Sequence, residues 1–488
     1  MLARAITHAL VGLEARPVEV EAHLQPGVPA FAIVGLPDKA CQEAKERVRS
    51  GIASAELEWP LRRITVNLAP AGLRKEGSGF DLPIALAVLA ASRQIPPDAL
   101  LEHAAIGELA LDGRLRPVPG VLVAAEAAGR AGVHRLICPV ESAAEAKLAG
   151  VDPVPVAHLA DVVAYFRGAY RPEDVDALPR SRANGGAAVP DLADVRGQER
   201  ARRTLEVAAA GRHNLLLSGP PGTGKTMLAR RLPGILPPLR DDEALEVTRI
   251  HSVAGLLPPG HGVVGERPFR APHHTASAPA VIGGGSPPRP GEVTLAHHGV
   301  LLLDELAEFA RPALEALRQP LEDGVVAVAR VTGRLLFPAR FVLVGTMNPC
   351  PCGARGDPGH ECLCAPQRLA AYREKVSRAL VDRFDLVLTV PRARSREYEG
   401  GAGESSGSVR GRIVAAAERL GGPALPFDPA AEMLLARAVD TLPLSGRGRT
   451  RVRRVARTIA ALAASEAVRA EHLAEALSYR TPTELRAG

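Results

Sequence analysis

The pattern of hydrophobic and polar residues predicts a mixed α+β region over residues 1–170. The short runs VEVEAHL, AFAIVGL and RITVNLAP are typical of β-strands. Between and after them, AKERVRSGIASAEL and LPIALAVLAASRQ are typical of helices. Residues 171–190 combine Pro, Gly, Asn and charged residues without periodicity, so we expect a linker there.

A different pattern begins near Asp191. A strand, a glycine turn and a helix are followed by the apolar strands of VLLLDEL, RFVLVGT and DLVLTV, an order that favours a parallel sheet covered by helices. A polar, glycine-rich stretch follows, and after it the periodicity is only helical. We therefore predict an α/β fold class in which an N-terminal α+β domain, a parallel-sheet domain (residues 191–391) and an all-helical domain (residues 413–488) are joined by linkers at residues 171–190 and 392–412.

The composition is that of an ordinary globular protein, since 46% of the 488 residues are hydrophobic and 23% are charged. No apolar run is long enough to cross a bilayer, and Glu14 interrupts the N-terminal stretch before a signal-peptide core is complete, so we expect a cytoplasmic protein with no membrane partner. The net charge of +6 is compatible with a polyanionic partner but does not identify one.

The stretch NLLLSGPPGTGKTMLARRL (residues 214–232) has the order strand, glycine-rich loop, helix. Its G-x-x-x-x-G-K-T spacing lets backbone N–H groups surround a phosphate at a helix N-terminus. Lys225 would bridge the β- and γ-phosphates of ATP, and the Thr226 hydroxyl would bind Mg²⁺. The predicted cofactor-binding residues are Gly219, Pro220, Pro221, Gly222, Thr223, Gly224, Lys225 and Thr226.

Later segments end in residues that suit phosphate-bond hydrolysis. GVLLLDEL ends in two acids, of which Asp304 would hold Mg²⁺ through water and Glu305 would polarise the attacking water. RFVLVGTMN ends in Asn348, whose amide would align that water. SRALVDRFDL places Arg383 where a neighbouring subunit would present it to the nucleotide.

Phosphate loop, acidic strand, sensor Asn and D-R-F-D together resemble the AAA+ ATPases, and the resemblance covers the whole central domain. It implies ATP and Mg²⁺ as cofactors and a homo-oligomeric ring, with Arg383 as an arginine finger that acts in trans. The stretches PFRAPHHTAS, PRPGEVTLAHHGVLLLDELAEF, LRQPLEDG, MNPCPCG and RVARTIA resemble, more specifically, the Mg-chelatase-like ATPases of the YifB/ComM type, over essentially all 488 residues.

The YifB/ComM resemblance implies a hexameric DNA helicase that promotes branch migration during natural transformation. It also implies that the helical domain is an AAA+ lid that contributes a second sensor arginine. We expect Arg447 in that role, and Arg451 is the alternative.

VVAVARVTGRLLFPARF (residues 325–341) alternates apolar residues around Thr332-Gly333, which predicts a β-hairpin. Related AAA+ helicases place such a hairpin in the pore of the ring. Arg330 and Arg334 near its tip would then follow the phosphate backbone of DNA without reading its sequence. A solvated hairpin end is the open alternative, because exposed arginines are common.

Four of the six cysteines form two close pairs, Cys350-x-Cys352 and Cys362-x-Cys364, separated by a glycine-rich reversal. Four thiolates suffice for a tetrahedral Zn²⁺ site, and reduced structural thiols are the alternative. His360 is a substitute ligand. A zinc-bound loop would stiffen the connection between the sensor Asn and the arginine finger.

The other cysteines and the histidine pairs carry no predicted chemistry. We expect Cys41 and Cys138 to be isolated core or surface thiols. Adjacent histidines point in different directions on a helix or strand, so packing roles are expected for them. The two pairs are His273 with His274, and His297 with His298.

Residues 65–122 resemble the Lon protease fold through APAGLRKEGSGFDLPIALA and IGELALDGRLRPVPGVLVAA. The motif puts Gly79 where that family has its nucleophilic serine and Leu122 where it has its lysine, and Ser78 is one position away. Because the dyad that activates the hydroxyl is missing, we predict no peptidase activity. A scaffold and a nucleic-acid guide remain open as roles of this domain.

Three functional hypotheses follow. The first is a ring-forming ATPase that moves DNA. The second is a chelatase motor subunit that drives Mg²⁺ insertion into a porphyrin, although such subunits generally lack the N-terminal domain. The third is a nucleotide-dependent scaffold without motor activity.

Overall fold

The computed structural model describes residues 1–175, 189–258, 260, 262–285, 288–330, 333–357, 359–393, 401–442 and 444–480. These residues divide into two compact units. The first unit combines the described residues of 1–182, 241–265 and 286–289, and the second contains the rest. None of the described helices is both long and apolar enough to span a bilayer.

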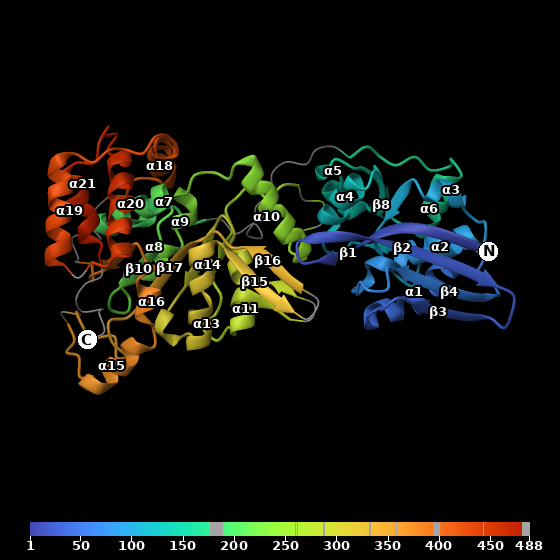
Figure 1. Ribbon diagram of the computed structural model, residues 1–488, viewed down its shortest axis with the longest axis horizontal. Helices are drawn as coiled ribbons and strands as arrows, with labels where there is room; N and C mark the ends of the chain where they lie inside the picture. The colour runs from blue at the N-terminus through green and yellow to red at the C-terminus, as the bar shows by residue number, and fades with distance from the viewer. Residues whose placement is uncertain are drawn as a thin grey trace. The chain divides into compact units, whose positions relative to one another are not determined.

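The first unit contains a seven-stranded mixed sheet in the order β3-β4-β2-β1-β5-β8-β9 (Figure 1). Strand β2 is antiparallel to both of its neighbours, and the other neighbouring strands are parallel. The predicted strands are confirmed within β2, β3 and β4. The bounds are β1 (Leu2–Val11), β2 (Glu14–Gln25), β3 (Ala30–Val34), β4 (Arg63–Ala69), β5 (His103–Ala105), β8 (Arg135–Pro139) and β9 (Asp152–Val156), with the short pair β6 (Glu108–Leu109) and β7 (Leu115–Arg116).

Helix α2 (Asp81–Ala91) is buried on every side. This burial explains why all its residues except Asp81 are apolar or proline. Helix α1 (Lys39–Ser54) begins at Asp38, whose carboxylate accepts a hydrogen bond from the Cys41 N–H at 2.7 Å. The remaining helices of the unit are α3 (Pro97–Leu100), α4 (Val121–Arg130), α5 (Ala143–Leu148), α6 (Leu159–Phe166) and α10 (Asp241–Val253).

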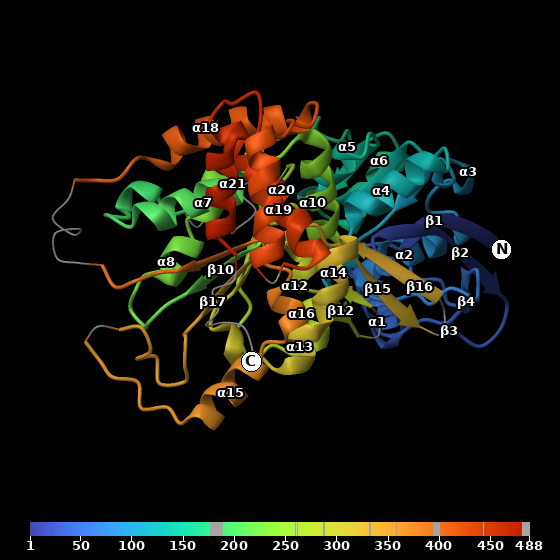
Figure 2. The same ribbon diagram turned by 60° about the vertical axis from the view of Figure 1, so that its left-hand side comes forward.

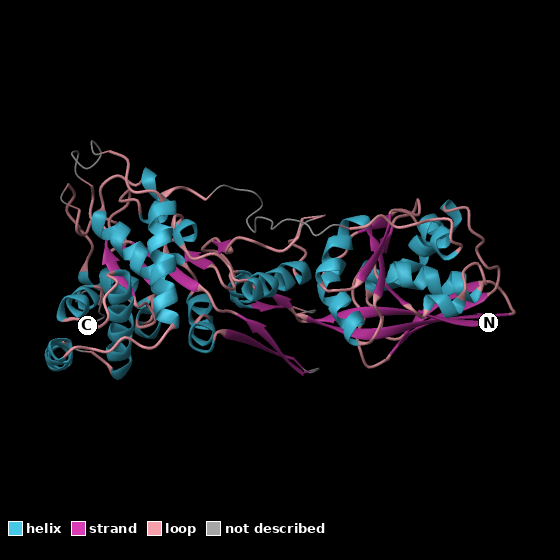
Figure 3. Cartoon of the chain, turned by 90° about the horizontal axis from the view of Figure 1, so that it is seen from above, coloured by secondary structure: helices cyan, strands magenta, loops and turns pink. Residues whose placement is uncertain are grey.

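The second unit is built on a five-stranded sheet in the order β11-β14-β17-β10-β18, and every neighbouring pair in it is parallel. The predicted parallel sheet is therefore confirmed. Its strands are β11 (Phe269–Arg270), β14 (Val300–Leu303), β17 (Val342–Met347), β10 (Leu215–Ser218) and β18 (Leu386–Thr389). The predicted hairpin also forms, as the antiparallel ribbon β15 (Val325–Arg330) and β16 (Gly333–Pro338), which is separate from the parallel sheet (Figure 1 and Figure 3).

The C-terminal part is helical, as predicted, and packs beside α7 (Glu199–Gly211) (Figure 2). One continuous apolar core joins the parallel sheet to these helices and includes Leu215, Val344, Ile413 and Ile459. The C-terminal helices are α18 (Ser406–Gly421), α19 (Pro429–Thr441), α20 (Gly446–Leu462) and α21 (Ala470–Ser478). The shorter elements of the unit are α8 (Lys225–Ala229), α9 (Leu232–Ile235), α11 (Ala278–Ile282), β12 (Gly283–Gly284), α12 (Glu292–Leu295), α13 (Arg311–Ala316), α14 (Arg318–Asp323), α15 (Pro366–Glu374) and α16 (Arg378–Val381). The two-residue strand β13 (Arg289–Pro290) has one residue in each unit.

The linker expected over residues 392–412 is too long, because α18 begins at Ser406 inside it. The glycines and serines of SGSVRGR suggested a coil. Tertiary contacts override that preference: the Ser406 hydroxyl accepts a hydrogen bond from the Leu192 N–H at 2.7 Å, and Val409 and Ile413 are buried.

The boundary between the two compact units also differs from a single break at residues 171–190. Helix α10, which lies within the sequence range expected for the parallel-sheet domain, packs against α4 in the first unit. The Arg249 guanidinium contacts Glu126 at 2.7 Å, and the Ser252 hydroxyl donates to Glu145 at 2.5 Å. Such contacts between distant segments leave no pattern in the local sequence.

Candidate nucleotide-binding site

Three polar segments meet at the carboxyl edge of the parallel sheet. Strand β10, which leads into the glycine-rich loop, lies between β17 and β18. Strand β14, which leads to Asp304, pairs with β17, which leads to Asn348. Because parallel strands end at the same edge, their terminal residues converge, and this edge is the usual ligand site of open α/β sheets.

The glycine-rich loop has conformations that require its glycines. Gly224 has φ of +85° directly before α8, a left-handed conformation that costs glycine little. A Cβ on Gly219 would lie 2.3 Å from the carbonyl oxygen of Val390, so only glycine fits there. The Thr223 hydroxyl donates to the Pro220 carbonyl at 3.0 Å and closes the turn.

The Lys225 ammonium is held at the centre of the loop. Its Nζ donates to the carbonyl oxygens of Gly219 at 2.7 Å and Pro220 at 2.8 Å, and to Oδ1 of Asn348 at 3.2 Å. Burial lowers the pKa of Lys225, while the two acids after β14 oppose this change. The structure thus brings together the predicted phosphate-binding lysine and the predicted sensor amide.

The Asp304 carboxylate accepts hydrogen bonds from two threonine hydroxyl groups. Thr226 Oγ1 donates to Asp304 Oδ1 at 2.9 Å, and Thr346 Oγ1 donates to the same oxygen at 2.6 Å. A carboxylate beside a threonine hydroxyl offers the oxygen ligands that Mg²⁺ prefers, so these residues fit the metal of a nucleotide complex. Sequence reasoning missed Thr346, although a lone polar side chain near the end of an apolar strand is a usable signal.

Glu305 has an unusual backbone conformation. Its φ of +56° and ψ of +52° lie in the left-handed region, which costs a residue other than glycine about 1 kcal/mol. Its N–H donates to Thr346 Oγ1 at 3.0 Å, which helps to hold this conformation. The side chain is exposed beside Asp304, where a carboxylate can contact water.

The Arg383 guanidinium is nearly buried, with 6% of its side chain exposed. Nη2 lies 2.6 Å from Oε1 of Glu322, and Nη1 donates to the Ala379 carbonyl at 2.7 Å. Its Nε is buried without a hydrogen-bond partner. Within one chain, therefore, this side chain is bound to Glu322, an acid in α14 to which the sequence assigned no role.

The two candidate sensor arginines contact other groups. Arg447 is 71% exposed and pairs with Glu322 at 3.1 Å, whereas Arg451 is 19% exposed and lies 3.6 Å from Oδ1 of Asp385. Among the described residues, no hydrogen bond or ion pair joins either arginine to the glycine-rich loop. The sensor role of both arginines stays a prediction.

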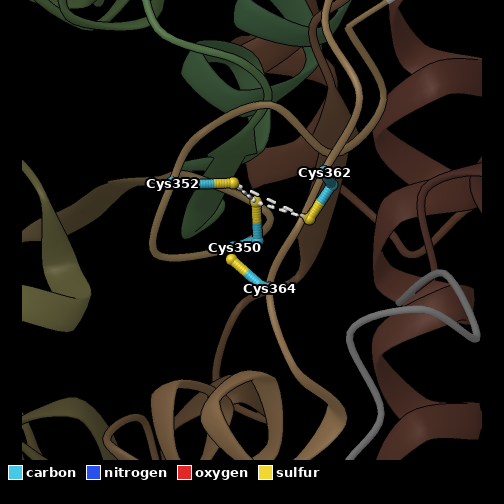
Figure 4. A group of neighbouring side chains, drawn as sticks. All are labelled: Cys350, Cys352, Cys362 and Cys364. Carbon is cyan, nitrogen blue, oxygen red and sulfur yellow. Dashed lines mark hydrogen bonds between the residues drawn. The ribbon is translucent and has the colours of Figure 1, made fainter.

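The four clustered cysteines converge on one point (Figure 4). The sulfur of Cys350 lies 3.4 Å from that of Cys352 and 3.6 Å from that of Cys362. The sulfurs of Cys352 and Cys362 are 3.7 Å apart. All four sulfurs, including that of Cys364, lie within 4.8 Å of one another. A Zn–S length of about 2.3 Å places the sulfurs of a tetrahedral site about 3.8 Å apart, whereas a disulfide needs about 2.05 Å. The arrangement fits a metal, and His360 instead pairs with Asp357 at 3.1 Å.

Of the two hairpin arginines, the exposed Arg334 lies in β16 opposite Ala329. Arg330 pairs with Gly333 along the backbone, and the predicted turn residue Thr332 lies outside the described residues. The histidine pairs form ring contacts, with ring centroids 4.1 Å apart in His273–His274 and 4.0 Å apart in His297–His298. Nδ1 of His297 accepts the backbone N–H of Arg340, in agreement with a packing role.

In the first unit, the positions that correspond to the Lon dyad are apolar. Leu122 is fully buried, and a Cβ on Gly79 would contact Ile106 and Val118 at 3.5 Å. The absence of peptidase activity stays a prediction. The two remaining cysteines, Cys41 and Cys138, are buried in the apolar clusters of this unit, and burial raises the pKa of the Cys41 thiol to about 12.

Comparison with protein families assigns this architecture to a class. Residues 191–398 match the family described as "Magnesium chelatase, subunit ChlI", residues 20–142 match "Subunit ChlI of Mg-chelatase", and residues 422–480 match "Magnesium chelatase, subunit ChlI C-terminal". The chain therefore belongs to the Mg-chelatase-like family of AAA+ proteins.

Within that family, the similarity to YifB and ComM proteins extends over nearly the whole chain. An uncharacterized protein of Mycobacterium tuberculosis (strain ATCC 25618 / H37Rv) is 45% identical over 98% of both chains. The protein YifB of Escherichia coli K12 is 42% identical over 97% of this chain and 96% of its own length. The competence protein ComM of Haemophilus influenzae is 42% identical over 99% of this chain and 98% of its own length. The predicted membership of the YifB/ComM family is thus confirmed.

Proposed function

We propose that this protein is the subunit of a ring-forming AAA+ ATPase that hydrolyses MgATP and uses the energy to move DNA. Its specific task is branch migration in recombination during natural transformation. The observation that carries the ATPase part is the convergence of Thr226, Asp304 and Thr346, with 2.9 Å and 2.6 Å between the two hydroxyls and the carboxylate, next to the glycine-rich loop. Full-length similarity to a protein named for competence supports the DNA part.

In this proposal, each part of the site has one task. Lys225 leaves its loop carbonyls to bind the β- and γ-phosphates, and Thr226 with Asp304 holds Mg²⁺, which neutralises the developing charge. Glu305 and Asn348 orient the attacking water. Arg383 of a neighbouring subunit stabilises the transition state, which makes hydrolysis dependent on assembly.

The remaining assignments of the motor follow the same proposal. The protein acts in the cytoplasm as a homo-oligomer, most simply a hexamer. The domains are a non-catalytic Lon-like domain (residues 1–170), an AAA+ core (residues 191–391) with a cysteine-rich insertion (residues 350–364), and a helical lid. We assign a structural Zn²⁺ to that insertion. Arg330 and Arg334 of the hairpin contact the DNA backbone.

The test uses the purified full-length chain with MgATP. We expect ATP turnover that forked or four-way DNA stimulates and that Lys225→Ala abolishes, together with ATP-dependent unwinding of the branched DNA. Stimulation by a porphyrin-inserting partner and not by DNA would favour the chelatase motor. Full cellular function of a Glu305→Gln variant would favour a scaffold without motor activity.

A further inference from the structure

The cysteine-rich loop contacts the glycine-rich loop of the candidate nucleotide site. A Cβ on Gly353 would lie 2.6 Å from Cγ of Pro221, so the two loops pack directly on each other there. Gly353 follows Cys352 in sequence, and its N–H donates to the Cys350 carbonyl at 3.0 Å. The first cysteine pair is therefore built into the surroundings of the phosphate-binding segment.

The other end of the cysteine-rich loop returns to Asn348. After Cys364 the chain enters α15, where the Tyr372 hydroxyl donates to the backbone oxygen of Asn348 at 3.3 Å. The side chain of Asn348 accepts a hydrogen bond from Lys225 at 3.2 Å. The described residues of 348–372 thus form a loop, closed by the bond between Tyr372 and Asn348, that contacts the candidate nucleotide site through Gly353 and through Asn348.

The centre of this loop has the chemistry of a metal site. Its four sulfurs lie within 4.8 Å of one another, at separations suited to a tetrahedron. The Arg355 N–H donates to Cys350 Sγ at 3.3 Å, the kind of outer contact that orients a metal ligand. Four sulfur ligands leave no open coordination position, so an ion held there would be structural.

We propose that Cys350, Cys352, Cys362 and Cys364 bind one Zn²⁺ ion that fixes Asn348 and the glycine-rich loop in the geometry required by the nucleotide. The metal occupancy of each subunit then sets its affinity for nucleotide. The link to nucleotide rests on the proposed ATPase function, whereas the metal site does not. Without the ion, only hydrogen bonds and packing would hold Gly353 against Pro221.

The metal site is tested on full-length protein purified without chelator. Elemental analysis should find about one zinc per chain in the wild type, and Co²⁺ substitution should give the thiolate-to-cobalt absorption of a tetrahedral site. Cys352→Ser, at an exposed position, should lose the zinc, whereas the matched control Cys138→Ala in the other unit should keep it. A wild-type protein that contains no zinc and takes up no Co²⁺ would overturn the inference.

The link to nucleotide is tested by the affinity for a fluorescent ADP analogue. Removal of zinc, with circular dichroism to show a retained fold, should weaken binding about tenfold, and restored zinc should reverse the loss. Equal affinity of the zinc-free and zinc-loaded forms would overturn the link while the metal site stands. If no form binds nucleotide, the link fails together with the proposed function, and the zinc content still decides the metal site.

Substitutions at two glycines distinguish the effect of the contact with Pro221 from the effect of the metal ligands. Gly353 and Gly356 have similar φ, +78° and +81°, but only Gly353 has a neighbour within 4 Å of an added Cβ. Gly353→Ala should therefore weaken nucleotide binding more than Gly356→Ala does, with about one zinc retained in both. Equal effects of the two substitutions would show that the contact with Pro221 does not transmit the metal's influence.

Discussion

The Arg383 guanidinium is bound to the Glu322 carboxylate, with 2.6 Å between Nη2 and Oε1. Glu322 also pairs with Arg447 at 3.1 Å, so one acid joins the D-R-F-D segment to the first turn of α20. In the proposed function, Arg383 must leave this acid to reach the nucleotide of a neighbouring subunit. Glu322 would then restrain the finger in an isolated chain.

Neutralising Glu322 should release this restraint. A hydrogen bond to a charged group is stronger than a neutral one by about 1 kcal/mol, so Glu322→Gln should raise the assembly-dependent kcat about fivefold. Arg383→Ala should lower kcat by about a thousandfold or more. The matched control is Glu432→Gln, because Glu432 also pairs with an arginine, Arg453, and is exposed to a similar extent. If Glu322→Gln instead lowers kcat, the acid positions the finger and does not restrain it.

Thr346 should matter for hydrolysis although it is not part of the glycine-rich loop. Thr346→Val keeps the shape but removes the bond to Asp304 and the acceptor of the Glu305 N–H. We expect kcat to fall by a factor of about 10 to 100, with a higher Mg²⁺ requirement, because both acids lose their orientation. A titration of turnover with Mg²⁺ measures this. The buried Thr204→Val is the control, and equal kcat in both variants would refute the role.

Asp385 should stabilise the second unit in a pH-dependent way. Burial raises its pKa, but the His213 ring, whose Nδ1 lies 3.6 Å from Oδ2, and the charge of Arg454 lower it more, so the folded pKa lies below the ordinary 3.8. Below pH 3.8 the unfolded chain takes up its proton first, and the contribution of Asp385 is lost as the pH falls through the folded pKa. Asn214 and Arg451 also face this carboxylate.

The measurement is thermal unfolding as a function of pH. Asp385→Asn should destabilise the second unit by about 3 kcal/mol near pH 7 and should flatten the loss of stability in acid. The control is Asp440→Asn, because Asp440 is an exposed aspartate of α19 in the same unit. An unchanged acid profile in Asp385→Asn would contradict the assignment.

The first unit should depend on a buried ion pair. Asp81 is fully buried, and Arg47 binds it through Nε at 2.6 Å and Nη2 at 3.0 Å. Arg47→Met would leave the carboxylate without its partner, and we expect a loss of about 3 to 5 kcal/mol in the free energy of unfolding of this unit. Arg116→Met removes the ion pair between an exposed arginine and the partly buried Glu108 and should cost under about 1 kcal/mol. Urea unfolding measures both variants. Similar losses in the free energy of unfolding for Arg47→Met and Arg116→Met would contradict the prediction.

The hairpin should contribute charge and not sequence specificity to DNA binding. Arg334→Ala should weaken the DNA-stimulated ATPase equally on unrelated sequences and reduce the salt dependence of binding by about one phosphate contact per subunit. Arg437→Ala, an exposed arginine of α19, is the control. A loss that varied with DNA sequence would argue against a backbone contact.

Local sequence predicted those parts of the site that are formed by short motifs of consecutive residues. The glycine-rich loop, the acids after β14 and Asn348 each follow directly from an apolar strand, and the parallel sheet brings those strand ends together. The two cysteine pairs were equally visible, because their short spacing and the glycines between them predict convergence. For these residues, secondary-structure order was sufficient to predict proximity.

The partners of these residues were not predictable, because they come from other elements. Nothing in the α14 sequence marks Glu322 as the acid that binds Arg383, which follows α16, and Arg447 of α20. Tyr372 reaches the Asn348 carbonyl across a connection of 24 residues. Helix α18 begins earlier than expected because the Ser406 hydroxyl accepts a hydrogen bond from the Leu192 N–H and the Ser406 N–H donates to the Asp191 carboxylate, a stabilisation that composition does not reveal.

The shared core of the second unit limits how this protein can do mechanical work. Leu215 of the sheet and Ile459 of α20 belong to the same apolar cluster. A rotation of the helices away from the sheet would therefore expose apolar surface to water, at a cost of about 25 cal/mol per Å². Sheet and helices should therefore behave as one rigid lever. The conformational changes of the proposed motor would then occur at the interfaces between neighbouring subunits of the ring.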